Sequence, residues 1–193
     1  MVSFLKSMKT LLIIVAIAMV GMQCVAPMRQ LYPGVYFPED RTYQNKALGF
    51  SFSFRGNWEI ITDPNKMKEN KTNAALLHQT GGELLFIGYT VEQTQGTRGI
   101  VVNLNETNRE YAEEIRRLNY DKELIDSGLT DTSLARLPMV KWVYEKEGFR
   151  FVEFFFKVDT YNVRIAFWTK PRLFPNFLSV YEETMGTLIV NER

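Results

Sequence analysis

Residues 48–59 of the chain read LGFSFSFRGNWE, and within them three phenylalanines alternate with two serines. Successive side chains of a β-strand point to opposite faces, so Phe50, Phe52 and Phe54 share one face while Ser51 and Ser53 share the other. This pattern is typical of a strand with one buried and one solvated face. The fold is therefore expected to be built around an aromatic sheet face.

The residues that follow predict a turn and a second strand. Gly56-Asn57 is a favourable turn sequence, and Trp58–Ile61 is predicted to form a short strand. Asp63-Pro64-Asn65 then ends that strand, because proline cannot continue a hydrogen-bonded ladder.

A second hairpin is predicted farther along. Ala74–His78 and Glu83–Tyr89 are strand candidates on either side of Thr80-Gly81-Gly82, a strong hairpin signal. Thr90–Gly99 is polar and contains two glycines, so it is expected to be a mobile loop.

One helix is predicted in the middle of the chain. Thr107 is followed three residues later by Glu110, which is the spacing of a capping box. Tyr111, Ile115 and Leu118 repeat at helical spacing behind it, so a helix is expected from about Asn108 to Leu118.

The second half of the chain is rich in aromatic residues and predicts an antiparallel meander. Its three strand candidates are Val140–Lys146, Phe149–Val158 and Tyr161–Thr169, joined by short turns. The middle one is apolar on both faces over part of its length, so it should be central. An amphipathic helix starting near Phe174, ended by Gly186, and a short strand over Thr187–Val190 complete an α+β fold with a largely antiparallel sheet flanked by helices.

The N-terminus resembles an export signal. Lys6 and Lys9 precede the apolar run Leu11–Met22, and Cys24, the single cysteine of the chain, follows it. Three fates are open. In a bacterial lipoprotein, cleavage before Cys24 leaves that residue as the lipid attachment site; in a secreted protein, cleavage falls after Ala26; otherwise the segment stays as an uncut N-terminal anchor.

The lipoprotein hypothesis divides the chain into a signal peptide (1–23), a tether or arm (24–44) and a folded domain (45–193). An arm of about 20 residues, fully extended, reaches roughly 65 Å. Alternatively, Tyr32, Val35, Tyr36 and Phe37 pack part of the arm onto the domain.

Charge and cysteine content exclude some classes of protein. Without residues 1–23 the chain carries 21 basic and 22 acidic residues, a net charge of −1, whereas nucleic-acid binders show a basic surplus or stripe. Because no cysteine follows Cys24, the exported domain is expected to fold without disulfides.

Residues 48–54, followed closely by Asn57-Trp58-Glu59, resemble the opening hairpin of PsbP-like domains, whose α/β/α sandwich is shared with the Ran-binding Mog proteins. The order of elements also fits, including Leu134, Leu137 and Pro138 before an aromatic meander, and the resemblance covers about Tyr43 to Val190. It implies a non-enzymatic accessory protein that binds other proteins. It carries no functional residue over to this chain.

Few residues are candidates for catalysis or metal binding. His78 is the sole histidine, and it is interpreted as a surface or hydrogen-bonded residue at a strand end. No Cys/His group with zinc spacing, P-loop, nucleophile elbow or dinucleotide fingerprint is present in the sequence. Three carboxylate pairs are interpreted as solvated charge: Glu113/Glu114, Asp121/Glu123 and Glu145/Glu147.

Glu153 is the exception, because it interrupts the apolar strand Phe149–Val158. A carboxylate buried there needs a partner, and Arg164 on the next strand is predicted to be that partner. A structural ion pair is favoured over a catalytic role.

The function expected from these features is that of a non-enzymatic accessory or binding protein at the bacterial cell envelope, without cofactor or metal. It would be held to the membrane at Cys24 and contact an envelope protein through its sheet rim and the Thr90–Gly99 loop. The alternative is a small-ligand carrier or hydrolase whose pocket lies between sheet and helix, lined by Trp142, Trp168, Tyr144 and Phe156. A structural envelope protein without a discrete ligand is a third possibility.

Overall fold

The computed structural model describes residues 30–67, 77 and 81–191. The strands in this part of the chain are β1 (Val35–Phe37), β2 (Thr42–Asn45), β3 (Phe50–Ser53), β4 (Trp58–Ile61), β5 (Gly82–Thr90), β6 (Gln95–Val102), β7 (Ile125–Leu134), β8 (Leu137–Lys146), β9 (Phe149–Val158), β10 (Tyr161–Thr169) and β11 (Ile189–Val190). The helices are α3 (Asn108–Asn119) and α4 (Phe174–Met185). No helix of the described residues has both the length and the apolar character needed to span a membrane.

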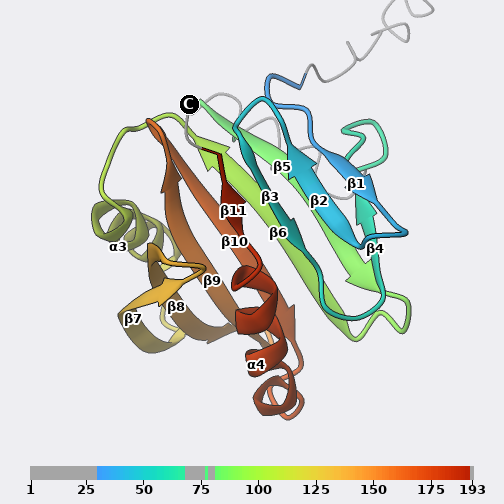
Figure 1. Ribbon diagram of the computed structural model, residues 1–193. Helices are drawn as coiled ribbons and strands as arrows, with labels where there is room; N and C mark the ends of the chain where they lie inside the picture. The colour runs from blue at the N-terminus through green and yellow to red at the C-terminus, as the bar shows by residue number, and fades with distance from the viewer. Residues whose placement is uncertain (1–29, 68–76, 78–80, 192–193) are drawn as a thin grey trace, which may run out of the picture.

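The strands form two antiparallel sheets (Figure 1). The larger sheet has seven strands in the order β4-β5-β6-β10-β9-β8-β7, and the smaller has four in the order β1-β2-β3-β11. The predicted α+β class with a largely antiparallel sheet is confirmed. The meander β8-β9-β10 is also confirmed, and β9 lies inside the sheet with a paired strand on each side.

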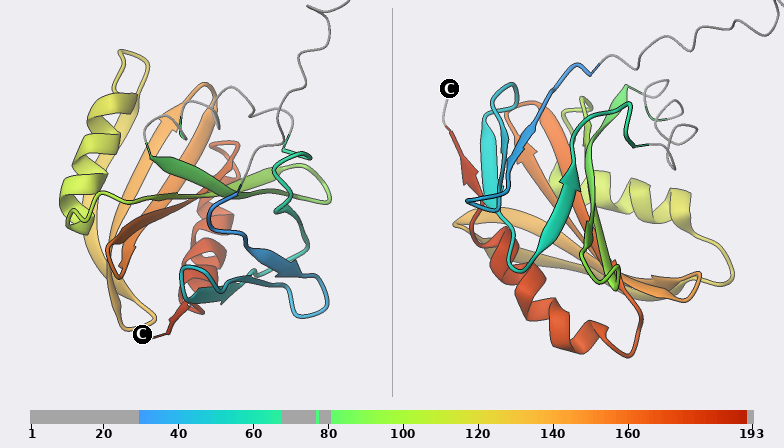
Figure 2. Two further views of the ribbon diagram at one scale, coloured as in Figure 1. Left: turned by 90° about the horizontal axis from the view of Figure 1, so that it is seen from above. Right: turned by 90° about the vertical axis from the view of Figure 1, so that its right-hand side faces the viewer.

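The two faces of the seven-stranded sheet are covered differently (Figure 2). Helix α3 lies on one face, where Tyr111 and Ala112 pack with residues of β8 and β9. The four-stranded sheet and α4 lie on the other face and share the largest apolar cluster with it. Both faces of the central strands are therefore withdrawn from water.

The alternating phenylalanines lie in that largest cluster. Phe50, Phe52 and Phe54 are all buried and make ring contacts with Phe86, Phe156 and Phe167 of the larger sheet. Such contacts add to the free energy that burial of the rings contributes. The sheet face predicted from the sequence is thus the surface on which the two sheets meet.

The predicted pairing of the first two strands is wrong. β3 and β4 belong to different sheets, and β3 pairs instead with β2 and β11. The chain changes sheet at Gly56, whose φ of +91° favours glycine because it has no Cβ. Alternation and turn composition predict strands, but they do not determine which strands pair.

The second predicted hairpin is also different in the structure. β5 is confirmed as a strand, but its neighbours are β4 and β6. The proposed partner Ala74–His78 lies outside the described residues except for Leu77. The mobile loop expected over Thr90–Gly99 is wrong, since residues 95–99 belong to β6 and pair with both β5 and β10.

Helix α3 begins as predicted. The Thr107 side chain accepts a hydrogen bond from the Glu110 amide, and the Glu110 side chain accepts one from the Thr107 amide, so both halves of the capping box are formed. Two hydrogen bonds from Thr107, one from its amide and one from its hydroxyl, hold the pKa of Glu110 below its usual value. The helix ends at Asn119, one residue beyond the prediction.

The C-terminal prediction is confirmed. Helix α4 starts at Phe174 and is followed by Gly186, and β11 then pairs with β3. Strand β7, in the turn-rich stretch before β8, was not predicted from the sequence. Most of its residues are polar and none is buried, so apolar and polar residues do not alternate along it.

The described part of the arm, residues 30–44, is packed on the domain. β1 pairs with β2, and β2 with β3. Tyr43 is fully buried between Phe50, Phe52 and Phe86, and Tyr32 makes an edge contact with Tyr161 of β10. Strand β2 runs from Thr42 to Asn45 and so crosses the expected boundary between arm and domain.

Candidate functional site

The buried charged residues that the sequence singled out lie on the α3 face of the large sheet. Glu153 is 1% exposed and occupies the middle of β9. It stands opposite Trp142 of β8 on one side and Ala166 of β10 on the other. Because paired residues of neighbouring strands share a face, Glu153 is surrounded by side chains of both strands.

Three side chains bind the Glu153 carboxylate, and together with it they form the Glu153 cluster. The Tyr144 hydroxyl donates to Oε1 over 2.9 Å, and the Arg164 guanidinium donates to Oε2 over 3.3 Å. Arg98 of β6 completes the cluster with a 3.6 Å ion pair to Oε1. The predicted pair Glu153–Arg164 is therefore confirmed, but it is part of a larger cluster.

Ala166 explains how Arg98 reaches a carboxylate two strands away. Arg98, Ala166 and Glu153 stand opposite one another on β6, β10 and β9. The Ala166 methyl group between them is small, so the long Arg98 side chain can extend across β10. Arg98 was missed because residues 90–99 were expected to form a loop. Tyr144 was predicted only as an aromatic residue lining a pocket, and its hydrogen bond to Glu153 was not predicted.

The electrostatics of the Glu153 cluster shift the pKa values of Arg164 and Tyr144 upward. Burial lowers the pKa of Arg164, but the Glu153 carboxylate together with Tyr111 and Tyr144 raises it, so the net shift is upward. Burial, followed by the charge of Glu153, raises the pKa of the Tyr144 hydroxyl. At neutral pH, Tyr144 is thus a hydrogen-bond donor to a carboxylate that two arginines also hold.

Four buried polar atoms in or near the Glu153 cluster have no hydrogen-bond partner among the described residues. They are Nε of Arg98, Nε of Arg164, the Tyr111 hydroxyl and Oε2 of Glu106. Electrostatic coupling of Tyr111 to Arg164, Glu153, Glu106 and Arg98 shows that these groups are close together, and burial raises the pKa of Tyr111 to about 12. Buried donors and acceptors of this kind are normally satisfied by water or by a bound polar group.

A row of contacting aromatic rings crosses the same face and is called the aromatic strip here. It runs from Tyr89 on β5 through Trp168 on β10 and Phe151 on β9 to Tyr144 and Trp142 on β8. Trp142 and Tyr144 are buried and pack in the cluster beneath α3, whereas Tyr89, Phe151 and Trp168 are partly exposed. The aromatic strip thus extends from the core to the surface.

Only three of the four aromatic residues predicted to line a pocket lie on the same face of the sheet. Trp142, Tyr144 and Trp168 belong to the aromatic strip, but Phe156 lies in the apolar cluster on the opposite face of the sheet. Glu153 and Phe156 are three residues apart on one strand, and the alternation of side chains places them on opposite faces. Phe156 therefore cannot line a site that contains Glu153.

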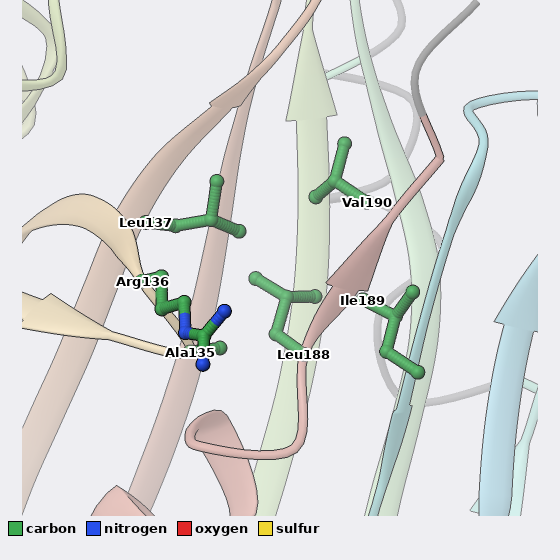
Figure 3. Close-up of a pocket in the computed structure, with 6 residues that line it drawn as sticks. All are labelled: Ala135, Arg136, Leu137, Leu188, Ile189 and Val190. Carbon is green, nitrogen blue, oxygen red and sulfur yellow. The ribbon is translucent and has the colours of Figure 1, made fainter.

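A shallow depression of about 320 Å³ lies at the other end of the molecule, between the β7–β8 turn and β11 (Figure 3). Ala135, Arg136 and Leu137 line one side, and Leu188, Ile189 and Val190 line the other. Ala135 and Arg136 both have positive φ, as the two central residues of a tight hairpin turn require. Ile189, on the edge strand of the small sheet, is largely exposed there.

The other candidate residues differ in what the structure shows of them. Cys24 and His78 lie outside the described residues. Among the predicted carboxylate pairs, Glu114 binds Arg117 and Asp121 binds Lys146, each over 2.6 Å. Within residues 30–67, 77 and 81–191, no group of three His, Cys, Asp or Glu side chains is placed to hold a metal ion.

A PsbP protein of known structure has a similar fold. The solution structure of cyanobacterial PsbP (CyanoP) from Synechocystis sp. PCC 6803 matches with a TM-score of 0.57 at 9% identity, over 78% of this chain and 91% of that chain. The chain therefore contains a domain with the PsbP-like fold, as the resemblance predicted.

Two further structures match over smaller parts. PA94, a protein of unknown function from Pseudomonas aeruginosa, is 12% identical with a TM-score of 0.41 over 51% of this chain and 75% of that chain. A structure from Bacteroides thetaiotaomicron is 13% identical with a TM-score of 0.44 over 75% of this chain and 46% of that chain. The sequence matches no family model, and no curated protein matches it.

Proposed function

We propose that the chain is an exported, non-enzymatic accessory protein of the bacterial cell envelope. In this proposal residues 1–23 are a lipoprotein signal peptide and Cys24 carries the lipid. The domain, an α/β/α sandwich of the PsbP and Mog type, contacts an envelope protein.

The main support for this proposal is that the Glu153 carboxylate is buried and already bound by other side chains of the domain. The carboxylate accepts a hydrogen bond from Tyr144 and forms ion pairs with Arg164 and Arg98. Glu153 is only 1% exposed. A carboxylate held in this way stabilises the charge of its partners, and proton transfer from a substrate would require breaking those contacts. The PsbP-like fold supports the same class of function, because the family resemblance implies accessory proteins that bind other proteins.

The partner contact is assigned to the sheet rim. Val91, in the turn between β5 and β6, is largely exposed, and so is Ile189 beside the depression at the β7–β8 turn. Ile189 lies on the edge strand β11, whose unpaired side can associate with another chain, and Val91 lies in a turn at the end of two paired strands.

Crosslinking in intact cells tests this assignment. A crosslinked partner should co-purify with the wild-type protein at native expression, and Val91→Asp or Ile189→Asp should reduce its recovery. Leu118→Asp, at an exposed apolar position of α3 and not on a strand, is the matched control and should leave recovery unchanged. Recovery of monomer alone would contradict the proposal.

Metabolic labelling with a radioactive fatty acid tests the anchor. Label should enter the wild-type protein and be lost in Cys24→Ser. Unlabelled wild-type protein would contradict lipidation, and its size would then distinguish cleavage after Ala26 from an uncut N-terminal segment.

A small-ligand carrier is the second candidate function, and the four unpartnered polar atoms beside the Glu153 cluster favour it. Such a site would take a small polar molecule that donates to Glu106 and accepts from Arg98 or Arg164. Native mass spectrometry of the protein purified from its own host tests this. A bound small molecule that is lost in Arg98→Gln would support the carrier, and a mass equal to that of the protein alone would count against it.

A further inference from the structure

The start of the described chain is clamped to the large sheet. Both oxygens of the buried Glu83 carboxylate on β5 accept backbone N–H groups, Oε2 from Leu31 over 2.7 Å and Oε1 from Tyr32 over 2.9 Å. The Asn45 side chain donates to the Tyr32 carbonyl over 2.9 Å, and the Tyr32 ring contacts Tyr161. Hydrogen bonds to an ionised acceptor are among the stronger ones in proteins, so the chain is held at residues 31 and 32.

This clamp limits how far the domain can move from an anchor at Cys24. Leu31 is the seventh residue after Cys24, and this stretch spans at most about 25 Å when fully extended. A free arm of about 20 residues would reach roughly 65 Å. An uncut segment that crosses the membrane up to Met28 would leave an even shorter connection. In either form of anchoring, the clamped end of the domain stays close to the lipid surface.

Exposed apolar side chains begin at the clamp and continue along β1. Leu31, Val35 and Phe37 are 58%, 52% and 43% exposed, and we call these three residues the apolar edge. Tyr36, between the last two, points inward onto Phe54. Across the outer face of the small sheet the neighbours of Val35 and Phe37 are Gln44 and Thr42, so the apolar character ends at β1.

We propose that the apolar edge rests on the phospholipid surface of the membrane to which the chain is anchored. This inference depends on the anchoring part of the proposed function. Three side chains are far fewer than the roughly 20–30 residues a side of a stable protein interface. They can nevertheless hold a surface to which the domain is already tethered, because a short tether makes the local concentration of lipid very high.

The charged residues beside the apolar edge limit how deeply the edge can enter the lipid. Glu39 and Asp40 follow Phe37 in the exposed β1–β2 turn, and Arg41 comes next. Carboxylates do not enter hydrocarbon, so the edge is confined to the headgroup boundary. A zwitterionic lipid surface fits this mixture of charges better than a strongly anionic one.

Site-directed quenching tests the contact with the full-length protein purified from membranes. The protein is reconstituted in phosphatidylcholine vesicles in which some lipids carry a nitroxide quencher near the headgroup. A fluorophore is attached at Gln44→Cys, opposite Val35, or at Ser127→Cys on β7, which lies across the molecule from β1 (Figures 1 and 2). Cys24 is the only natural cysteine, and a lipid thioether there leaves the introduced thiol as the single labelling site.

The lipid contact predicts about twofold or greater quenching at position 44 than at position 127, because only residues near the headgroup boundary approach the quencher. Adding Val35→Ser and Phe37→Ser should reduce the quenching at 44 to the level at 127. Ile189→Ser, which removes an exposed apolar side chain at the opposite edge of the same sheet, should leave it unchanged.

Three results would overturn the inference, and they are distinguishable. Equal quenching at 44 and 127 in a lipidated, vesicle-bound protein would overturn the lipid contact and leave the proposed anchoring intact. Protein without fatty acid that separates from vesicles would overturn both. Shielding of the fluorophore at 44 without lipid, increasing with protein concentration, would show that a second copy of the chain covers the apolar edge.

Discussion

The indole of Trp168 lies directly against Gly96: a Cβ atom at residue 96 would be only 2.2 Å from the ring carbons Cε2 and Cζ2. The two residues are opposite one another on β10 and β6. The absence of a side chain at Gly96 therefore lets the Trp168 ring lie flat on the sheet, between Tyr89 and Phe151. A glycine that looked like a loop residue in the sequence is needed for the packing of the aromatic strip.

Gly96→Ala is expected to destabilise the domain by about 1–3 kcal/mol, since the added methyl group must displace the indole. Urea unfolding measures the loss. In a Trp168→Leu background the same substitution should cost clearly less, because the ring it collides with is gone. Equal costs in the two backgrounds would show that the contact does not limit the packing.

Glu153→Gln is expected to lower the free energy of unfolding by about 3–5 kcal/mol, because it leaves Arg164 buried without its counter-charge. Arg98→Gln should cost much less, since the Arg98 side chain is 32% exposed and its ion pair is long, at 3.6 Å. Denaturant unfolding of both variants checks the order. The ion-pair assignment would be wrong if Arg98→Gln were the more damaging change.

Asp126 is expected to make the free energy of unfolding depend on pH in the acidic range. Burial raises its pKa, but the Trp142 indole, the Gly128 amide and the Arg116 guanidinium all bind the carboxylate, and the net shift is downward. A carboxyl with a lowered folded pKa stabilises the fold above its unfolded pKa of about 3.9, and this contribution is lost as the pH falls through the folded value.

Asp126→Asn should therefore be less stable than wild type by about 1–2 kcal/mol at neutral pH. The difference should shrink as the pH falls from about 4 through the lower folded pKa of Asp126, because the carboxyl is protonated first in the unfolded chain and then in the folded protein. Urea unfolding of both proteins across this range measures the difference. A gap that stays constant with pH would contradict the assignment.

Glu83→Gln is expected to loosen the clamp on residues 31 and 32. A glutamine amide offers one acceptor where the carboxylate offers two, so one of the two backbone N–H groups loses its partner. Because a hydrogen bond to a charged group contributes about 1.5–3 kcal/mol, the Leu31 or Tyr32 amide should exchange with solvent at least about tenfold faster.

Hydrogen exchange measured by NMR gives these rates for single residues. Glu59→Gln, on the exposed side of the neighbouring strand β4, is the control and should leave both amides unchanged. Unaltered exchange at both positions in Glu83→Gln would mean that packing of Tyr32, and not the carboxylate, holds the chain.

Local sequence patterns predicted most of the elements and one polar contact. The alternation in Phe50–Phe54, the capping box of Thr107 and Glu110, and the aromatic meander were all confirmed, because each depends on residues close together in the chain. The Glu153–Arg164 pair was predictable as well, since a carboxylate in an apolar strand needs a partner and the adjacent strand offered one arginine.

The association of distant segments was not contained in those patterns. The sequence shows that Gly96, Arg98 and Glu83 are small or polar, but not that β6 joins the centre of the sheet or that Glu83 receives the start of the chain. Strand pairing depends on which faces bury the most apolar surface together, and that is a property of the whole domain. The chain therefore determines its strands and helices locally, whereas packing of the two sheets brings Arg98 to Glu153, Trp168 onto Gly96, and Leu31 and Tyr32 to Glu83.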